Sequence, residues 1–174
     1  MALRKILIEP NDLLRKKSLP VEKVDDDVRQ VMDDMLETMY AAPGIGLAAI
    51  QIGEPKRIIV IDLSKQDEPR NPMFFINPEI IKKSTTNLTY EEGCLSVPGQ
   101  FAEIDRPDKC HIKYLDYHGI PKETETEGML ATCIQHEIDH LEGILFIDYL
   151  SKLKKTMIVK KLSKHKKELE RIVV

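Results

Sequence analysis

The stretch CIQHEIDHLEG, residues 133–143, holds two histidines four residues apart, with a glutamate directly after the first. This is the H-E-x-x-H pattern of metal-dependent hydrolases. Residues four apart lie on one face of a helix, so the imidazoles of His136 and His140 can converge on one ion. Glu137 points about 100° away from His136, so it is expected to reach a water beside the metal, not the metal itself. The motif therefore predicts a metal-binding helix.

Apolar residues around the motif place this helix in the core. The helical pattern runs from Gly128 to about Leu141. Its flanking aliphatic residues are Ile134, Ile138, Leu141 and Ile144. Each buried polar group without a partner costs roughly 1–3 kcal/mol, so two histidines and a glutamate in a buried helix need a common reason. Metal binding supplies one.

The third ligand is not part of this motif. A catalytic site of this kind normally takes three ligands from the protein, and one extension supplies a further histidine in H-E-x-x-H-x-x-G-x-x-H. This chain follows that extension to Gly143 and then has Phe146 in place of the histidine. The candidates elsewhere are Glu142, His111, His118, Asp148, Glu92 and the cysteines Cys94, Cys110 and Cys133. Cys94, in the glycine-flanked segment EEGCLSVPG, can be carried toward the helix by a loop, but the residues alone leave the choice open.

The remaining pattern predicts an α+β fold in a single domain. An amphipathic helix is expected over Val28 to Met39, ended by Pro43-Gly44. The expected strands cover residues 57–63, residues 73–81 with a bend or end at Asn77-Pro78, and residues 110–117, which form a hairpin through His118-Gly119 with the segment after Pro121. From Ile147 onward a second helical stretch, broken only by Ser151, runs to the C-terminus. Residues 1–150 are expected to form the catalytic part and residues 147–174 a basic helix on or extending from the same domain.

Composition excludes several classes of protein. The chain has 174 residues, 42% of them hydrophobic and 32% charged, which is typical of a globular domain and not of a disordered one. No apolar run approaches the ~20 residues that span a bilayer, and the N-terminal residues do not resemble a signal peptide. Three cysteines without framework spacing are expected to be free thiols in a reducing cytoplasm.

Charge is distributed unevenly along the chain. Residues 151–174 contain nine Lys or Arg and two Glu, a net charge of +7, whereas residues 1–150 contain 17 basic and 27 acidic residues, a net charge of −10. A basic tail on an acidic body indicates an anionic partner for the tail, such as RNA phosphates, or a solvated helix face.

Two further motifs accompany the helix. PGIGLAAIQIG, residues 43–53, is glycine-rich but matches neither phosphate-binding glycine pattern, and EGCLS spans residues 92–96. Together with QHEIDHLEG, residues 135–143, they resemble the three-motif signature of the peptide deformylases, in order and with similar spacing. The resemblance covers almost the whole chain. It implies small, mostly antiparallel sheets around a central metal-binding helix, with one helix near each terminus.

The resemblance also implies roles for individual residues. Cys94, His136 and His140 would be the metal ligands, with water in the fourth position, and Glu137 the general acid and base. The amide of Gln51 and the backbone N–H of Leu95 would stabilise the oxyanion. The implied substrate-binding residues are Gly44, Ile45, Gly46 and Cys133, and Glu92 paired with Arg106 would brace the Cys94 loop. At Phe101 many family members carry a basic residue, which puts in doubt any substrate-backbone contact made there.

The implied reaction removes the formyl group from the N-terminal formyl-methionine of nascent peptides and releases formate. The implied cofactor is one divalent ion, Fe²⁺ in the first place, with Ni²⁺, Co²⁺ or Zn²⁺ able to take the site. The basic tail resembles a helix that contacts the ribosome in one bacterial branch of the family. A cytoplasmic location is expected, with neither membrane association nor sequence-specific nucleic-acid binding.

Two other functions compete with this interpretation. A zinc endopeptidase would share the H-E-x-x-H motif, but its third ligand would be a glutamate or histidine. A non-catalytic domain associated with RNA or the ribosome would use a structural metal closed by four protein ligands, and only three suitable residues are found.

Overall fold

The computed structural model describes residues 2–172 of the chain, and side chains as far as Glu168. The helices are α1 (Asp26–Ala41), α2 (Gly128–Leu141) and α3 (Lys152–Ile172), with short 3-10 turns η1 (Asp12–Arg15), η2 (Ala49–Ile52) and η3 (Phe146–Tyr149). The strands are β1 (Gly46–Ala48), β2 (Ile58–Ile61), β3 (Met73–Lys83), β4 (Asn87–Cys94), β5 (Val97–Pro107), β6 (Lys109–Leu115) and β7 (Pro121–Glu127). The predicted α+β class is confirmed.

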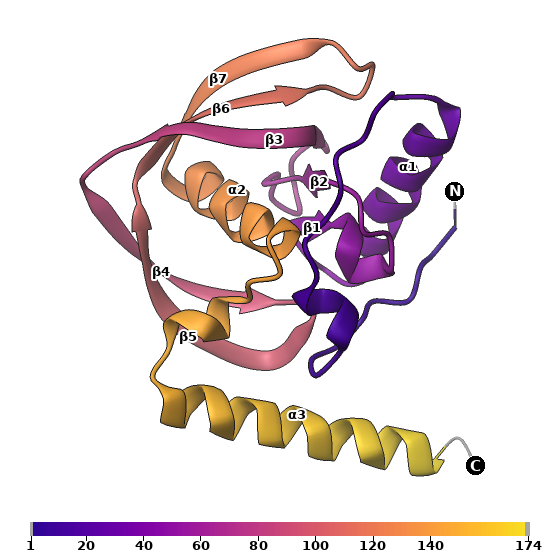
Figure 1. The fold of residues 1–174 in the computed structure, drawn as a ribbon, viewed down its shortest axis with the longest axis vertical. Coiled ribbons are helices and arrows are strands. Elements are labelled where there is room, and N and C mark those ends of the chain that lie inside the picture. The colour runs from indigo at the N-terminus through magenta and orange to yellow at the C-terminus, as the bar shows by residue number, and fades with distance from the viewer. Residues whose placement is uncertain (1, 173–174) are drawn as a thin grey trace.

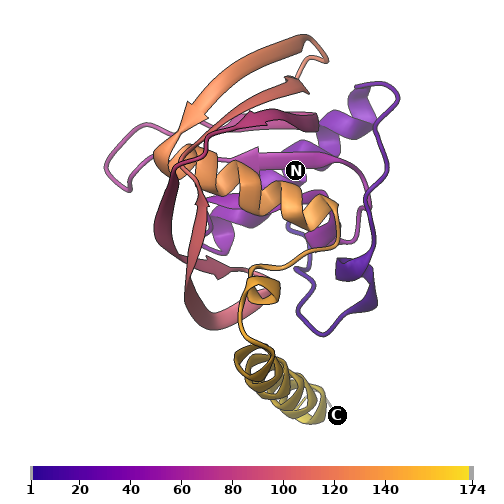
Figure 2. The ribbon, with the colours of Figure 1, turned by 60° about the vertical axis from the view of Figure 1, so that its left-hand side comes forward.

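Two antiparallel sheets surround α2, as Figures 1 and 2 show. The larger sheet has five strands in the order β1-β2-β3-β6-β7, and the smaller is the hairpin of β4 and β5. The central helix predicted from the H-E-x-x-H motif is therefore correct in its place as well as in its bounds. The hairpin of β6 and β7 was predicted too, and it pairs Leu115 with Pro121 next to the turn.

Helix α1 forms where its apolar spacing predicts it. The side chain of Asp25 accepts a hydrogen bond from the backbone N–H of Val28 and caps the first turn. Met32, Met35 and Met39 follow at helical spacing and are fully buried against β1 and β2. This packing fixes the end of α1 next to the glycine-rich segment that follows it.

Strand β3 continues through the predicted interruption at Asn77-Pro78. Asn77 has φ of 51°, and the register with β6 shifts between Ile76 and Glu79, so the strand bends at a bulge but does not end. The Asn77 side chain compensates for the lost ladder contacts: its Oδ1 accepts from the N–H of Val21 at 2.8 Å, and its Nδ2 donates to the carbonyl of Val21 at 2.8 Å.

The helical stretch predicted from Ile147 onward begins later than expected. Phe146 and Ile147 are buried in the separate turn η3, and α3 starts only at Lys152. Ser151 marks the start because its hydroxyl accepts from the backbone N–H of Lys154 at 3.3 Å. Residues 173 and 174 of the predicted tail lie outside the described residues. Strand β5 was not anticipated as an element of its own.

Helix α3 lies along one side of the molecule (Figure 1). Leu162 is its buried anchor, in a cluster with Val97, Ile104 and Phe146, while the outer face of the helix is exposed. Among the described residues, none of the helices combines the length and the apolar composition that a bilayer crossing needs.

Gly143, which ends the motif, allows the chain to leave α2 in the left-handed conformation. Its φ is 75°, and a Cβ added there would lie 2.4 Å from the backbone oxygen of Arg15. Gly53 also has a positive φ, of 88°, but an added Cβ would meet nothing within 4 Å. A side chain at Gly53 would therefore cause backbone strain alone, whereas a side chain at Gly143 would cause both strain and steric overlap.

We predict that Gly143→Ala lowers the free energy of unfolding by more than ~2 kcal/mol, since left-handed strain and a clash with fixed backbone act together. Gly53→Ala carries the strain alone and should cost about 1 kcal/mol. Urea unfolding followed by circular dichroism measures both, and equal losses would show that the contact with Arg15 relaxes freely.

Candidate metal centre

Three donor atoms from two elements converge beside the core. Cys94 is the last residue of β4, and His136 and His140 lie one turn apart on α2. The Sγ of Cys94 is 3.2 Å from the Nε2 of His140, and one donor atom from each residue lies within 4.8 Å of the other two. The two histidines are buried and Cys94 is partly buried.

This donor set suits a divalent transition metal. A thiolate and two imidazoles are ligands for zinc and for iron, and three protein ligands leave a position open, as catalytic sites do. Although burial disfavours charge on His136, hydrogen bonds to Cys94 and Glu92 and the nearby carboxylate of Glu137 raise its pKa well above the ordinary value. The negative groups that hold a proton there would also stabilise a metal cation.

The other residues considered as third ligand are engaged elsewhere or lie apart. Glu142 pairs with Arg57 and Lys17, His111 with Glu123, Asp148 with Arg15, and Cys110 with Thr126, while His118 follows β6 in a turn. Glu92 does touch the site, but its Oε2 faces the Nδ1 of His136 at 2.8 Å. Of the candidates, Cys94 is the one whose donor atom joins the two histidines.

Glu92 and Arg106 form a buried pair behind the histidine. The Nε and Nη2 of Arg106 donate to the two oxygens of Glu92 at 2.5 and 3.0 Å. Burial opposes ionisation of Glu92, but the hydrogen bonds from His136 and Arg106 hold its pKa below the ordinary value. The carboxylate therefore orients the imidazole of His136, with Nδ1 directed away from the donor group.

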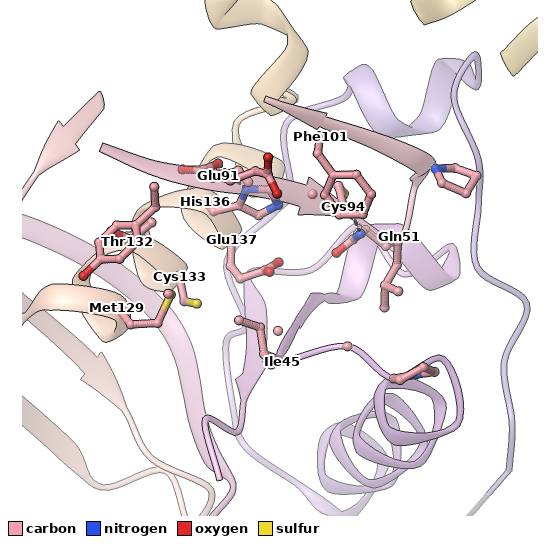
Figure 3. Close-up of a pocket in the computed structure, with 18 of the residues that line it drawn as sticks. Ile45, Gln51, Glu91, Cys94, Phe101, Met129, Thr132, Cys133, His136 and Glu137 are labelled. Carbon is pink, nitrogen blue, oxygen red and sulfur yellow. Dashed lines mark hydrogen bonds and ion pairs between the residues drawn. The ribbon is translucent and has the colours of Figure 1, made fainter. Parts of the chain in front are cut away.

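Glu137 projects into the cavity between His136 and Ile45 (Figure 3). The residue is 5% exposed, and its Oε2 finds no hydrogen-bond partner among the described residues. A Cβ added at Gly46 would lie 2.5 Å from its Oε1, so only glycine leaves this carboxylate its place. Burial raises the pKa of Glu137 to about 7.

Gln51 reaches the same group from η2. Its Oε1 accepts from the N–H of Ala48 at 2.8 Å, which turns the amide nitrogen toward Cys94 Sγ at 3.5 Å and Ser96 Oγ at 3.0 Å. Leu95 lies between Cys94 and Ser96 in the turn from β4 to β5. Ser96 is fully buried and was not predicted from the sequence, because its partner lies 45 residues away.

A cavity of about 440 Å³ opens beside the donor group. Figure 3 shows Ile45 on one side of it and Cys94 and Phe101 on the other. The predicted substrate-binding residues Gly44, Ile45, Gly46 and Cys133 all line this cavity, as do Gln51, Leu95 and Glu137. Burial raises the pKa of Cys133 to about 12, so this cysteine remains a neutral apolar wall.

Among the residues of the wall that sequence reasoning missed are Met129 and Thr132 of α2. Met129 lies four residues before Cys133, and Thr132 four before His136, so both share a helix face with residues that were predicted. Helical spacing could have found them. Phe101 is 64% exposed at the mouth, and its ring packs where a Cβ on Gly93 would fall.

Comparison with known proteins gives one consistent result. The sequence model of the family described as polypeptide deformylase matches residues 3–156. The chain is 63% identical to the peptide deformylase of Pelagibacter ubique (strain HTCC1062) over 174 residues, 100% of both chains. Against the peptide deformylase of Phenylobacterium zucineum (strain HLK1) it is 58% identical over 167 residues, 96% of this chain and 99% of the other.

Solved structures agree with these relatives. The peptide deformylase from Ehrlichia chaffeensis in complex with actinonin matches with a TM-score of 0.90 and 43% identity, covering 95% of this chain and 98% of that one. The peptide deformylase from Legionella pneumophila matches with a TM-score of 0.89 and 45% identity, covering 98% and 99%.

We predict that Cys94→Ala abolishes stoichiometric metal binding, because two imidazoles alone leave the ion without its thiolate. Elemental analysis after dialysis against a weak chelator measures this. Cys110→Ala is the matched control, since Cys110 is a buried cysteine whose thiol is hydrogen-bonded to Thr126. This substitution should leave the metal content unchanged. Full occupancy in Cys94→Ala would show that a different residue completes the site.

Proposed function

Because this chain belongs to the polypeptide deformylase family, we propose that Glu137, Gln51 and Leu95 carry out its reaction beside the Cys94, His136 and His140 group. The reaction hydrolyses the formyl amide at the N-terminal formyl-methionine of newly made polypeptides. Its products are formate and a free amino terminus. The observation that carries this assignment is the convergence of a thiol and two imidazoles at a cavity with a buried carboxylate, one oxygen of which has no partner among the described residues.

Cys94, His136 and His140 would hold one divalent ion. When bound, the ion supplies a Lewis acid that makes water nucleophilic at neutral pH. Ferrous iron is the ion we propose, on the family resemblance, and Ni²⁺, Co²⁺ or Zn²⁺ can take the same donors because a thiolate with two imidazoles accepts several of these metals.

Glu137 acts as the general acid and base. It takes the proton of the attacking water and returns it to the amine as formate leaves. Its position supports this role: the side chain lies in the cavity wall, is buried, and has one oxygen without a partner among the described residues. A positioned proton-transfer group typically contributes ~10²–10⁴ in rate.

Gln51 and Leu95 stabilise the negative charge that develops on the formyl oxygen. The Gln51 amide nitrogen is directed to the donor group because its oxygen is bound by Ala48 N–H. Leu95 follows Cys94 directly, so its backbone N–H lies beside the same ligand. One such donor placed in advance can contribute ~3–4 kcal/mol.

The substrate adds to the free edge of β1. This strand is the first in the order of the five-stranded sheet, so no strand of the described residues pairs with its outer edge. Gly46 of β1 lines the cavity together with Gly44 and Ile45 just before the strand, and an extended peptide can pair with the backbone of this segment. The methionine side chain would lie against the apolar surfaces of Ile45, Met129 and Cys133.

The two competing functions fit the site less well. An endopeptidase of the H-E-x-x-H type would take a glutamate or histidine as third ligand, and Glu142, His111 and His118 lie outside the donor group. A structural zinc site would be closed by four protein ligands. Among the described residues, three donors gather here, beside a cavity.

We further propose that residues 147–174 act as a basic appendage to the catalytic part in residues 1–150 and contact ribosomal RNA in the cytoplasm. The lysines Lys152, Lys154, Lys160, Lys161, Lys164, Lys166 and Lys167 of α3 are exposed. Arg171 belongs to the same predicted surface, but its side chain lies outside the described residues. Nascent chains emerge from the ribosome, so such contact would place the cavity near its substrate.

We predict that the protein, purified without oxygen and loaded with Fe²⁺, releases formate from a formyl-Met-Ala peptide. Glu137→Gln should lower kcat by at least ~10³, because the amide cannot accept the proton. Its metal content should stay at one ion per chain. Formate release by the loaded Glu137→Gln variant at the native rate would reject Glu137 as the base, and no release by loaded native protein would reject the proposed function.

The lysines of α3 give an independent prediction. Replacing Lys160, Lys164 and Lys167 together by Glu should weaken co-sedimentation with ribosomes, and the native binding should fall steeply with salt. The matched control reverses three exposed lysines of the large sheet, Lys82, Lys83 and Lys113. Equal loss in both triple variants would indicate an effect of net charge alone, and peptide deformylation should be unchanged in either.

A further inference from the structure

Arg106 is a buried cation held between two carboxylates, and only one of them has a place in the proposed chemistry. The residue is 4% exposed. Its Nε and Nη2 bind Glu92, and its Nη1 donates to the Oδ2 of Asp139 at 2.8 Å. Asp139 lies within the H-E-x-x-H motif, directly before His140, yet it points away from the metal ligands toward Arg106.

Tyr149 closes the outer side of this ion pair. Its hydroxyl donates to the same Oδ2 of Asp139 at 2.8 Å. The Cζ of Arg106 also lies 5.0 Å from the centroid of the Tyr149 ring, within the range of a cation–π contact. Tyr149 therefore touches both partners of the Arg106–Asp139 pair, from the end of η3 and just before α3.

These contacts form one continuous path to a metal ligand. The Oε2 of Glu92 meets Arg106 Nη2 at 3.0 Å and His136 Nδ1 at 2.8 Å. A guanidinium is planar and rigid, so fixing Nη1 on Asp139 also fixes the direction of Nε and Nη2. The orientation of Glu92, and through it of the His136 ring, depends on how firmly Arg106 is held at its far end.

The exposure of Tyr149 argues against a packing role alone. Its side chain is 52% exposed, so removal of the hydroxyl opens no cavity in the core. By contrast, Asp139 is largely covered, at 17% side-chain exposure, and both of its partners meet on a single oxygen. Asp139 and Tyr149 together hold the buried guanidinium of Arg106 at its outer end.

We propose that Asp139 and Tyr149 are positioning residues for His136, acting through Arg106 and Glu92. The inference rests on the metal centre proposed above and extends it to the segment that leads into the C-terminal helix. Neither residue touches substrate or metal. Their effect is on the orientation of one ligand, and so on metal affinity and turnover, while contacts with the peptide stay as they are.

The test replaces Asp139 by Asn and Tyr149 by Phe and measures cobalt binding by competition with a chelator, together with the visible spectrum of the Co²⁺-loaded protein. Outer partners of ligands typically contribute 10–100-fold in metal affinity. We expect a loss of about 10-fold for Asp139→Asn and ~3-fold for Tyr149→Phe, which is one contact further out. The cobalt absorption bands should shift, and kcat should fall with KM unchanged.

Tyr117→Phe is the matched control. It also removes a tyrosine hydroxyl that donates to an aspartate, Asp33 on α1, at 3.1 Å, but among the described residues this hydroxyl bonds to Asp33 alone and not to a partner of the metal ligands. Its cobalt affinity and spectrum should equal those of the native protein, measured at a temperature where circular dichroism shows every variant folded.

Native affinity and spectrum in both Asp139→Asn and Tyr149→Phe would overturn the inference, and so would an equal change in Tyr117→Phe. In those cases the native protein still binds cobalt and releases formate, so the proposed function stands. Failure of the native protein to bind any metal would instead remove the metal centre and the inference with it.

Discussion

Burial of ionisable side chains on α2 is the constraint on which the rest of the structure depends. His136, Glu137 and His140 are all nearly inaccessible to solvent, in a helix that both sheets enclose. Groups of this kind are costly in a core unless each has a partner. Glu92 is the hydrogen-bond partner of His136, and the thiol of Cys94 is the partner of His140. Glu137 lies beside a cavity.

The fold around the helix follows from this requirement. The hairpin of β4 and β5 exists in the right place to carry Glu92 and Cys94 on one strand and Arg106 on the other. The five-stranded sheet ends at β1, where Gly46 leaves room for Glu137 and borders the cavity. The hairpin thus contributes Cys94 and the residues behind His136, β1 borders the cavity, and α2 lies between them with His136, Glu137 and His140.

Much of this could be read from local pattern. The four-residue spacing of His136 and His140 predicts both the helix and its metal, and Phe146 in place of a third histidine directs attention to a ligand elsewhere. The bounds of α2 and the hairpin of β6 and β7 were predicted correctly, because helical period and turn chemistry are short-range signals. Strand β5 was missed because Pro98 and Gly99 at its start are turn signals. The separate turn η3 was missed because its burial depends on Val97, Ile104 and Leu162 from other elements.

By itself, the sequence determined the ligand types and, through three motifs in family order, the reaction, and it predicted Glu137 as the general base. Those properties reside in residue identity and in spacing along one helix or loop. Only the tertiary structure decided which residues contact the predicted site residues. Ser96 is hydrogen-bonded to Gln51, and Asp139 is hydrogen-bonded to both Arg106 and Tyr149. Side chains from separate elements come into contact only after the sheets and helices pack, and the periodicity of a single helix or strand does not predict those contacts.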